Sequence, residues 1–230
     1  MSDKTQNSEN RELSRRQFLK FAGGIAAGVG FGGSLPRLFQ LSDGIIAVPA
    51  SEGYLLIDTK KCAGCLSCMM ACSLVHEGKE NLSLSRIQIL QNPYGRFPED
   101  ISQEFCRQCV YPACVEACPT GALAADAKTG RVRIVYQNKC VGCQQCVEAC
   151  HYDPSRVVWN HEDKYSIKCD LCANTPYWNE KGGPDGCQAC IEICPMKAIA
   201  FTKDIPRQDM EGYTVNLRGL AWKNLGFPTD

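Results

Sequence analysis

The sequence has little of what enzymes and nucleic-acid-binding proteins commonly use. It contains only three histidines in 230 residues, and no grouping of histidine, serine and carboxylate residues suggests an active site. His76 and His161 stand alone in the sequence, and we expect both at the surface. The 25 basic and 25 acidic residues cancel in charge, and the basic ones are scattered along the chain. No phosphate-binding face is predicted, which argues against a nucleic-acid partner.

Long hydrophobic runs and tryptophan are scarce as well. The most apolar stretch, 21–31, is interrupted by glycines and is shorter than the roughly 20 apolar residues that a membrane-spanning helix needs. No later stretch reaches that length, so we expect no transmembrane span in the mature chain. The three tryptophans, Trp159, Trp178 and Trp222, are expected to be packing or interface anchors.

Residues 1–50 are predicted to be an export leader. The motif S-R-R-Q-F-L-K at 14–20 resembles the twin-arginine signal at every fixed position. That route carries folded proteins, which suits a chain whose cofactors are inserted in the cytoplasm. Small residues at 48–50 predict cleavage after Ala50, with an uncut tether as the alternative. We therefore expect a periplasmic protein that is exported folded, and partners could associate it with the membrane.

Cysteine is the residue that the chain does have in abundance. Of seventeen cysteines, sixteen fall into four compact groups. The groups are, in order, Cys62, Cys65, Cys68 and Cys72; Cys106, Cys109, Cys114 and Cys118; Cys140, Cys143, Cys146 and Cys150; and Cys169, Cys172, Cys190 and Cys194. Groups one and three have the C-x2-C-x2-C-x3-C spacing of iron–sulfur proteins. Because four thiolates hold one [4Fe–4S] cube, sixteen suffice for four cubes.

Disulfides and zinc are the competing uses of so many thiols. The total is odd and neighbouring cysteines lie close together, whereas disulfides usually join distant segments. Cys169, Cys172, Cys187 and Cys190 alone would pass for a zinc ribbon, but zinc does not explain the spacing of groups one and three. A zinc-binding or structural cysteine-rich assembly protein is the alternative function.

The seventeenth cysteine, Cys187, lies three residues before Cys190. It is either a spare thiol or a ligand in place of Cys190. The run Cys190-x3-Cys194-Pro195 reproduces the ferredoxin pattern, which favours Cys190 as the ligand.

Short strand-like runs and single helical turns accompany the cysteine groups. Strands are predicted at 54–58, 122–124, 131–136 and 198–201, and helical turns at 69–71, 115–117 and 191–193. The unit of strand, ligand loop, short helix and strand recurs at an irregular period. We predict an α+β fold of two ferredoxin-like modules with small β-hairpins, short helices and four [4Fe–4S] clusters.

Segments outside these repeated units are expected to form surface. Two insertions, 73–105 and 173–189, are long enough to face a partner. The stretch after residue 205 has little periodicity, and we expect it to wrap the body or a partner.

The order of the four groups resembles the four-cluster iron–sulfur subunits of the dimethyl sulfoxide reductase type. The resemblance covers about 53–205. It is carried by Cys-Arg-Gln-Cys-x4-Cys-x3-Cys-Pro-Thr-Gly-Ala at 106–122, Cys-Val-Gly-Cys-x2-Cys-x3-Cys at 140–150 and Lys-Cys-Asp-Leu-Cys at 168–172. It implies a non-catalytic electron-transfer subunit. Its implied partners are a molybdopterin- or tungstopterin-type catalytic subunit and a membrane quinone-linked or cytochrome subunit.

The same resemblance implies a domain organisation and four ligand sets. The four-cluster domain would span 51–205, with 53–105 and 165–205 forming one module, 106–164 the other, and 206–230 a tail. Set one would be Cys62, Cys65, Cys68 and Cys194; set two Cys169, Cys172, Cys190 and Cys72; set three Cys106, Cys109, Cys114 and Cys150; and set four Cys140, Cys143, Cys146 and Cys118. All four sets are complete, whereas a catalytic cube with an open iron would need only three cysteines.

One position departs from the family pattern. His151 follows Cys150 where the family usually has proline. A protonatable ring there would link the potential of a neighbouring cube to pH. A solvated histidine with no redox role is the simpler interpretation, and we favour it.

Overall fold

The computed structural model describes residues 39–42, 45–209 and 211–226. The twin-arginine motif at 14–20 and the apolar stretch at 21–31 lie outside the described residues. Within the described part, no helix combines the length and apolar character needed to cross a bilayer.

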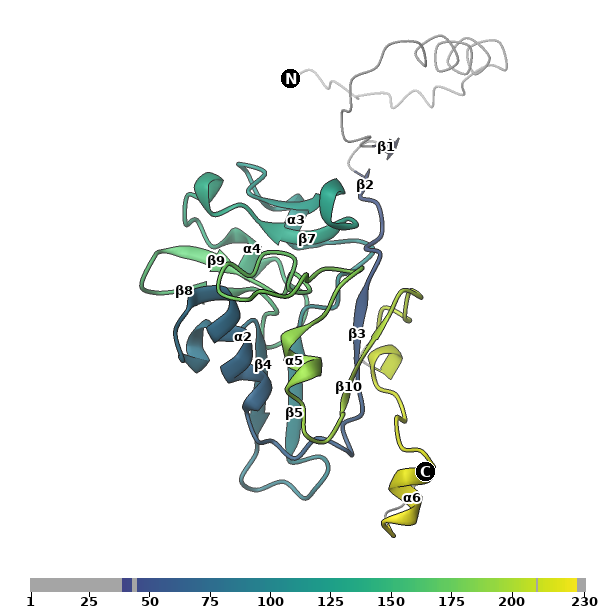
Figure 1. Ribbon diagram of the computed structural model, residues 1–230. Coiled ribbons are helices and arrows are strands. Elements are labelled where there is room, and N and C mark those ends of the chain that lie inside the picture. Colours follow the sequence, from purple (N-terminus) through teal and green to yellow (C-terminus); the bar gives the residue numbers. More distant parts are fainter. Residues whose placement is uncertain (1–38, 43–44, 210, 227–230) are drawn as a thin grey trace, which may run out of the picture. The chain divides into compact units, whose positions relative to one another are not determined.

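The sheets of the described residues are all antiparallel pairs of short strands (Figure 1). The pairs between sequence neighbours are β1 (Phe39–Ser42) with β2 (Ile45–Ala47), β4 (Ile87–Gln91) with β5 (Ile101–Phe105), β6 (Leu123–Asp126) with β7 (Val132–Val135), and β8 (Val158–Asn160) with β9 (Tyr165–Ile167). The remaining pair joins β3 (Tyr54–Ile57) to β10 (Ile199–Thr202), two strands that are far apart in the sequence. An isolated two-stranded sheet is marginal in water, so these pairs depend on packing against the rest of the domain.

The predicted strands are present at β3, β6, β7 and β10, and each borders a cysteine group. β3 precedes group one and pairs with β10, which follows group four. β6 follows group two and pairs with β7, which precedes group three. Strand pairing therefore links the first group to the last and the two middle groups to each other. The fold is a small mixture of short strands and few helices, as in ferredoxin-like domains.

The helices of the described residues are short, and all but the last carry cysteines. They are α2 (Ser67–Glu77), α3 (Ala113–Glu116), α4 (Gln145–Glu148), α5 (Ala189–Glu192) and, in the tail, α6 (Leu220–Asn224). Single 3-10 turns occur at Leu82–Leu84, Ala127–Thr129, Gln137–Lys139 and Glu211–Tyr213. In α2 to α5 the second residue is the third cysteine of its group. α2 packs against α5 and α3 packs against α4, which repeats the linkage made by the strands.

The main core contains thiols as well as hydrocarbon side chains. Tyr54, Phe105 and Ile199 are buried in the same cluster as Cys68 and Cys190. Because burying apolar surface provides most of the driving force for folding, the cysteine groups are part of what must be packed for the domain to form.

Segment 73–105, which we expected to be a partner-facing insertion, contributes to this core. Ile87 and Ile89 on β4 and Phe105 on β5 are buried in the main cluster. The alternation of β4 turns its isoleucines inward and its polar residues outward. The part of the segment with exposed aromatic side chains is the hairpin turn, where Tyr94 and Phe97 lie.

The C-terminal tail lies along the body, as the sequence led us to expect. Thr214 bridges Ile57 of β3, and the Val215 N–H donates to the Ile57 carbonyl at 3.1 Å. The Tyr213 ring is buried, and its hydroxyl donates to the carbonyl of Arg107 beside the second cysteine group.

Candidate metal centres

The cysteines lie together in neighbourhoods that cross the sequence groups. All seventeen are free thiols. Burial, together with the charges of Cys62, Cys194 and Cys65, raises the pKa of Cys68 to about 12. A group-four cysteine therefore stands beside three cysteines of group one.

Group four has the reciprocal arrangement. Burial raises the pKa of Cys190 well above its ordinary value, and the charges of Cys172, Cys169 and Cys72 act in the same direction. The charge of Cys72, the last cysteine of group one, also raises the pKa of Cys169 and of Cys172, so Cys72 is a neighbour of three group-four cysteines.

The two middle groups also exchange their last cysteines. Burial raises the pKa of Cys114 to about 12, and Cys106, Cys109 and Cys150 contribute to the rise. For Cys146 burial is again the main cause of a raised pKa, with Cys118 and Cys140 among the neighbours that raise it. The neighbourhoods also touch one another, since the charge of Cys68 raises the pKa of Cys190 and that of Cys106 raises the pKa of Cys169. Cys143 is exposed.

A left-handed residue precedes the second cysteine of every group. Gly64, Gln108, Gly142 and Leu171 have φ angles of 64°, 48°, 71° and 55°. Alternating right- and left-handed residues point successive N–H groups into one concavity, which is a common way of binding an anion. At Gly142 the conformation leaves no room for a side chain, because a Cβ would lie 2.9 Å from the Lys164 carbonyl oxygen.

The last cysteine of each group accepts one backbone N–H. The donors to Cys72, Cys118, Cys150 and Cys194 are the N–H groups of Arg86, Leu123, Arg156 and Ala198, each 3.3 Å from sulfur. Such bonds stabilise a thiolate and tune the potential of the cluster that it ligates. Each group has one backbone N–H donor to its last cysteine, at the same distance from sulfur. The last cysteines of the four groups therefore occupy equivalent positions.

The donor set suits a cluster better than a single ion. Among the described residues, no three His, Cys, Asp or Glu side chains come close enough together to hold one metal ion. Zinc draws its thiolates to about 2.3 Å from one centre. A four-iron cube places its own atoms between the thiolates, which therefore stand further apart. Free thiols gathered in this way fit [4Fe–4S] clusters.

The prediction that His76 lies at the surface was wrong. His76 is 5% exposed on α2, where its Nε2 lies 2.9 Å from Asp170 Oδ1 and its Nδ1 lies 2.8 Å from the Cys72 carbonyl oxygen. Burial opposes a charge on the ring, but the hydrogen bonds with Asp170 and Cys72 raise the pKa of His76 to about 9. The spacing of His76 from Cys72 could have predicted its burial. Residues four apart share one face of a helix, so His76 lies on the same face as Cys72.

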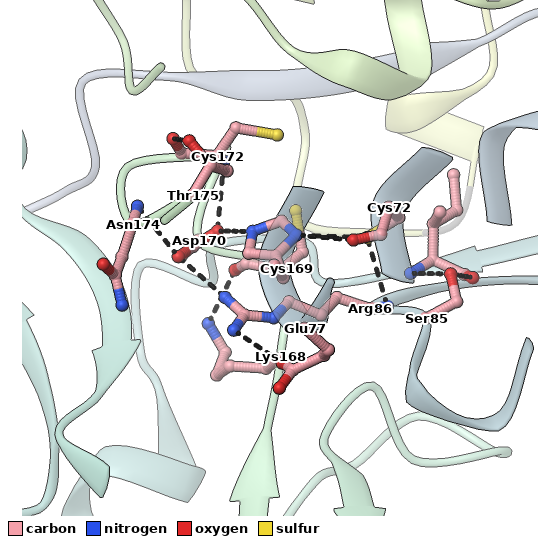
Figure 2. Close-up of polar contacts among 12 residues, drawn as sticks. Cys72, Glu77, Ser85, Arg86, Lys168, Cys169, Asp170, Cys172, Asn174 and Thr175 are labelled. Carbon is pink, nitrogen blue, oxygen red and sulfur yellow. Dashed lines mark hydrogen bonds and ion pairs between the residues drawn. The ribbon is translucent and has the colours of Figure 1, made fainter. Parts of the chain in front are cut away.

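Asp170 is the centre of the buried network that contains His76 (Figure 2). Its second oxygen accepts from Arg86 at 2.7 Å, and Arg86 also pairs with Glu77 at 3.3 Å. Burial opposes ionisation of Asp170, but the Arg86 charge and the His76 hydrogen bond hold the pKa of Asp170 below its usual range. Asp170 also accepts the Cys172 N–H at 3.0 Å. The network therefore joins α2, the segment that leads into β4, and the group-four ligand loop.

The other singled-out residues lie near the surface. His161 is exposed, as expected, and His151 is exposed with its ring 4.2 Å from the Tyr152 ring. Cys187 is exposed, whereas Cys190 is buried among other thiols. Trp178 packs against a small buried cluster, in line with a packing role.

Comparison with known proteins identifies the family. Residues 99–204 match the 4Fe-4S dicluster domain, and residues 12–32 match the twin-arginine translocation pathway signal sequence. The protein NrfC of Escherichia coli K12 is 38% identical over 194 residues, which cover 82% of this chain and 79% of NrfC. The chain belongs to the NrfC family.

Two further relatives of this NrfC-family chain are named for an aliphatic sulfonate oxidoreductase and for a hydrogenase-2 operon. The polyferredoxin-like subunit of the Pyrococcus furiosus aliphatic sulfonate oxidoreductase is 39% identical over 142 residues, covering 61% of this chain and 70% of that subunit. The hydrogenase-2 operon protein HybA of Escherichia coli O157:H7 is 28% identical over 217 residues, covering 82% of this chain and 62% of HybA.

Family membership establishes what the cysteine-rich domain is for. The chain is an iron–sulfur electron-transfer subunit with [4Fe–4S] clusters as its cofactors. Its twin-arginine signal directs it to the periplasm.

Proposed function

We propose that this chain holds four [4Fe–4S] clusters on the sixteen cysteines of sets one to four. The observation that carries the proposal is the exchange of last cysteines between groups: Cys194 stands beside group one, Cys72 beside group four, Cys150 beside group two and Cys118 beside group three. In two-cluster ferredoxins the last cysteine of each run likewise ligates the other cluster.

The sets divide between two ferredoxin-like modules within 51–205. One module comprises 53–105 and 165–205, in which β3 pairs with β10 and α2 packs on α5. The other comprises 106–164, in which β6 pairs with β7 and α3 packs on α4. The equivalence of these two arrangements supports the division. Residues 1–50 are the leader, cut after Ala50, and 206–230 are the tail.

The subunit relays electrons and does no bond chemistry of its own. Each cluster, when bound, accepts and releases one electron. Cys65 of set one and Cys143 of set four are exposed, whereas sets two and three contain no exposed cysteine. Sets one and four, which contain these exposed cysteines, are therefore suited to exchange electrons with partners. The partners are a molybdopterin- or tungstopterin-type catalytic subunit and a membrane quinone-linked or cytochrome subunit.

Metal analysis of the anaerobically purified mature chain tests the cluster count. We expect about sixteen iron and sixteen acid-labile sulfide per chain, with broad absorption near roughly 400 nm that bleaches on reduction. A reproducible count near twelve would mean that one set does not hold a cube. A colourless protein with stoichiometric zinc would support the assembly-protein alternative. For the partner, we expect the polypeptide that co-purifies with the chain to contain molybdenum or tungsten.

A further inference from the structure

Lys168 is a buried cation without a carboxylate partner. Its side chain is in the interior, and its Nζ donates to the carbonyl oxygen of Arg133 at 2.6 Å. It also donates to the carbonyl oxygen of Cys169 at 3.3 Å (Figure 2). Within the described residues, no Asp or Glu oxygen comes within ion-pair distance of Lys168. Burial opposes its charge, yet the thiolates of Cys106, Cys114 and Cys169 hold the pKa of Lys168 above its ordinary value.

Arg133, on β7, is a second cation of this kind. It is 1% exposed, and its guanidinium donates to the carbonyls of Arg131 and Cys109, both at 2.8 Å. Among the described residues its buried Nε has no hydrogen-bond partner, and no carboxylate pairs with it. Burial lowers the pKa of Arg133, and the thiolates of Cys106, Cys109 and Cys114 act against that change.

Gln108 connects the two cations to the ligand loop. It is fully buried, and its Oε1 accepts the Arg133 N–H at 2.9 Å. Its own backbone N–H donates to Cys106 Sγ at 3.4 Å, and its Nε2 donates to the Cys169 carbonyl at 2.9 Å. Set three and its cations are thus fixed to set two by a fully buried side chain.

Beside set two and beside Cys150 the buried positive and negative charges cancel, and the cavity at set one is mainly apolar. Beside set two, Arg86 and His76 are balanced by Asp170 and Glu77. Set one lines a mainly apolar cavity with Ile57, Ile89 and Ile199. Near Cys150 of set three, the buried pair Arg156 and Glu104 has no net charge. Among the described residues, the two buried cations Lys168 and Arg133 have no carboxylate partner; Arg133 lies against the Cys109 carbonyl of set three, and Lys168 contacts Arg133 and the Cys169 carbonyl of set two.

A buried charge is costly unless an opposite charge compensates it. Arg133 donates to the carbonyl of Cys109 in set three, and Lys168 donates to the carbonyls of Arg133 and Cys169, so the ligand thiolates are the anions close to both cations. An oxidised cube with its four thiolates would carry a net charge of about −2, and reduction adds one more negative charge. The two cations therefore stabilise the reduced state more than the oxidised state, and that raises the reduction potential.

We propose that Lys168 and Arg133 make set three, Cys106, Cys109, Cys114 and Cys150, the centre of highest reduction potential in the chain. This inference rests on the proposed cluster sets. In the electron-transfer step, the neighbouring cluster is oxidised by one electron, set three is reduced by that electron, and no proton moves. An electron that enters through set one or set four, which contain the exposed Cys65 and Cys143, would then rest on set three, which has no exposed cysteine.

Lys168→Met and Lys168→Arg in the cluster-loaded chain test the proposal by redox titration monitored by electron paramagnetic resonance. Methionine keeps the length of the side chain and removes its charge, while arginine keeps the charge. We expect Lys168→Met to lower the highest midpoint potential by at least about 59 mV, which is a tenfold loss in the one-electron reduction constant. Lys168→Arg is expected to retain most of the potential. Lys203→Met, at an exposed lysine paired with Asp185, is the control and should shift nothing.

Two further variants keep the test decisive. Cys109→Ser identifies set three, because it should alter the signal with the highest midpoint and leave the others. Arg133→Gln should lower the same midpoint, even if Lys168→Met fails to fold. Sixteen iron with unshifted potentials, or a shift confined to signals that Cys109→Ser leaves intact, would overturn this inference alone. A wild-type chain without iron would overturn the proposed function and this inference with it.

Discussion

His76 Nε2 and Asp170 Oδ1 lie 2.9 Å apart although 94 residues separate them in sequence. The contact joins the helix that carries Cys68 and Cys72 to the loop that carries Cys169 and Cys172. Both side chains are buried, so the pair exists only when groups one and four are packed together. It therefore couples the stability of the protein to the geometry of the ligand loops.

Asp170→Asn is expected to destabilise the loaded protein strongly. Arg86 and His76 would lose the charge that compensates them, and breaking a buried ion pair costs about 3–5 kcal/mol. The measurement is the apparent thermal midpoint under anaerobic conditions, together with iron content. The matched control is Asp185→Asn, which removes an exposed ion pair with Lys203 and should leave both unchanged. Equal stability of the two variants would contradict a role for the network.

Gly142→Ala is expected to lower the iron content toward twelve per chain, because set four would be lost. The residue has a φ of +71°, and its new Cβ would meet the Lys164 carbonyl oxygen at 2.9 Å. Gly121→Ala is the control, since Gly121 has a φ of +62° but nothing within 4 Å of the place that a Cβ would occupy. Both substitutions impose a left-handed alanine at about 1–2 kcal/mol. Only the first adds a clash with backbone, and unchanged iron in Gly142→Ala would refute the expectation.

Cys187→Ser is expected to leave iron, sulfide and the visible spectrum unchanged. Cys187 is exposed, whereas Cys190 lies buried beside Cys172 and Cys169. Cys190→Ser should therefore lose iron, and metal analysis of the two variants side by side decides which thiol is a ligand. Loss of iron from Cys187→Ser with retention in Cys190→Ser would reverse the assignment.

Changing Arg15 and Arg16 to lysine together is expected to leave the cluster-loaded protein in the cytoplasm. The twin-arginine route reads the arginine pair itself, so conserving the charge is not enough. Cell fractionation measures the distribution, and Arg11→Lys, just outside the motif, is the control. Normal export of the double variant would show that another signal directs the chain.

Much of the local structure could be predicted because its causes are local. The alternation at 131–136 predicted β7, and the run at 54–58 predicted β3. The longer helix α2 was not predicted beyond a single turn, and for that reason the inward position of His76 was missed. Ile87 and Ile89 carried an alternation that predicts a strand, but the segment was interpreted as an insertion.

The sequence by itself determined the chemistry of the ligands, their spacing, the repeated unit and the export signal, because each of these is a property of neighbours along the chain. Only the tertiary structure decided which thiols lie together and where charges remain unbalanced. Whether Lys168 faces a carboxylate or a thiolate depends on segments distant in sequence, as does the pairing of His76 with Asp170. Burial and electrostatic compensation are set by packing, and no local spacing encodes them.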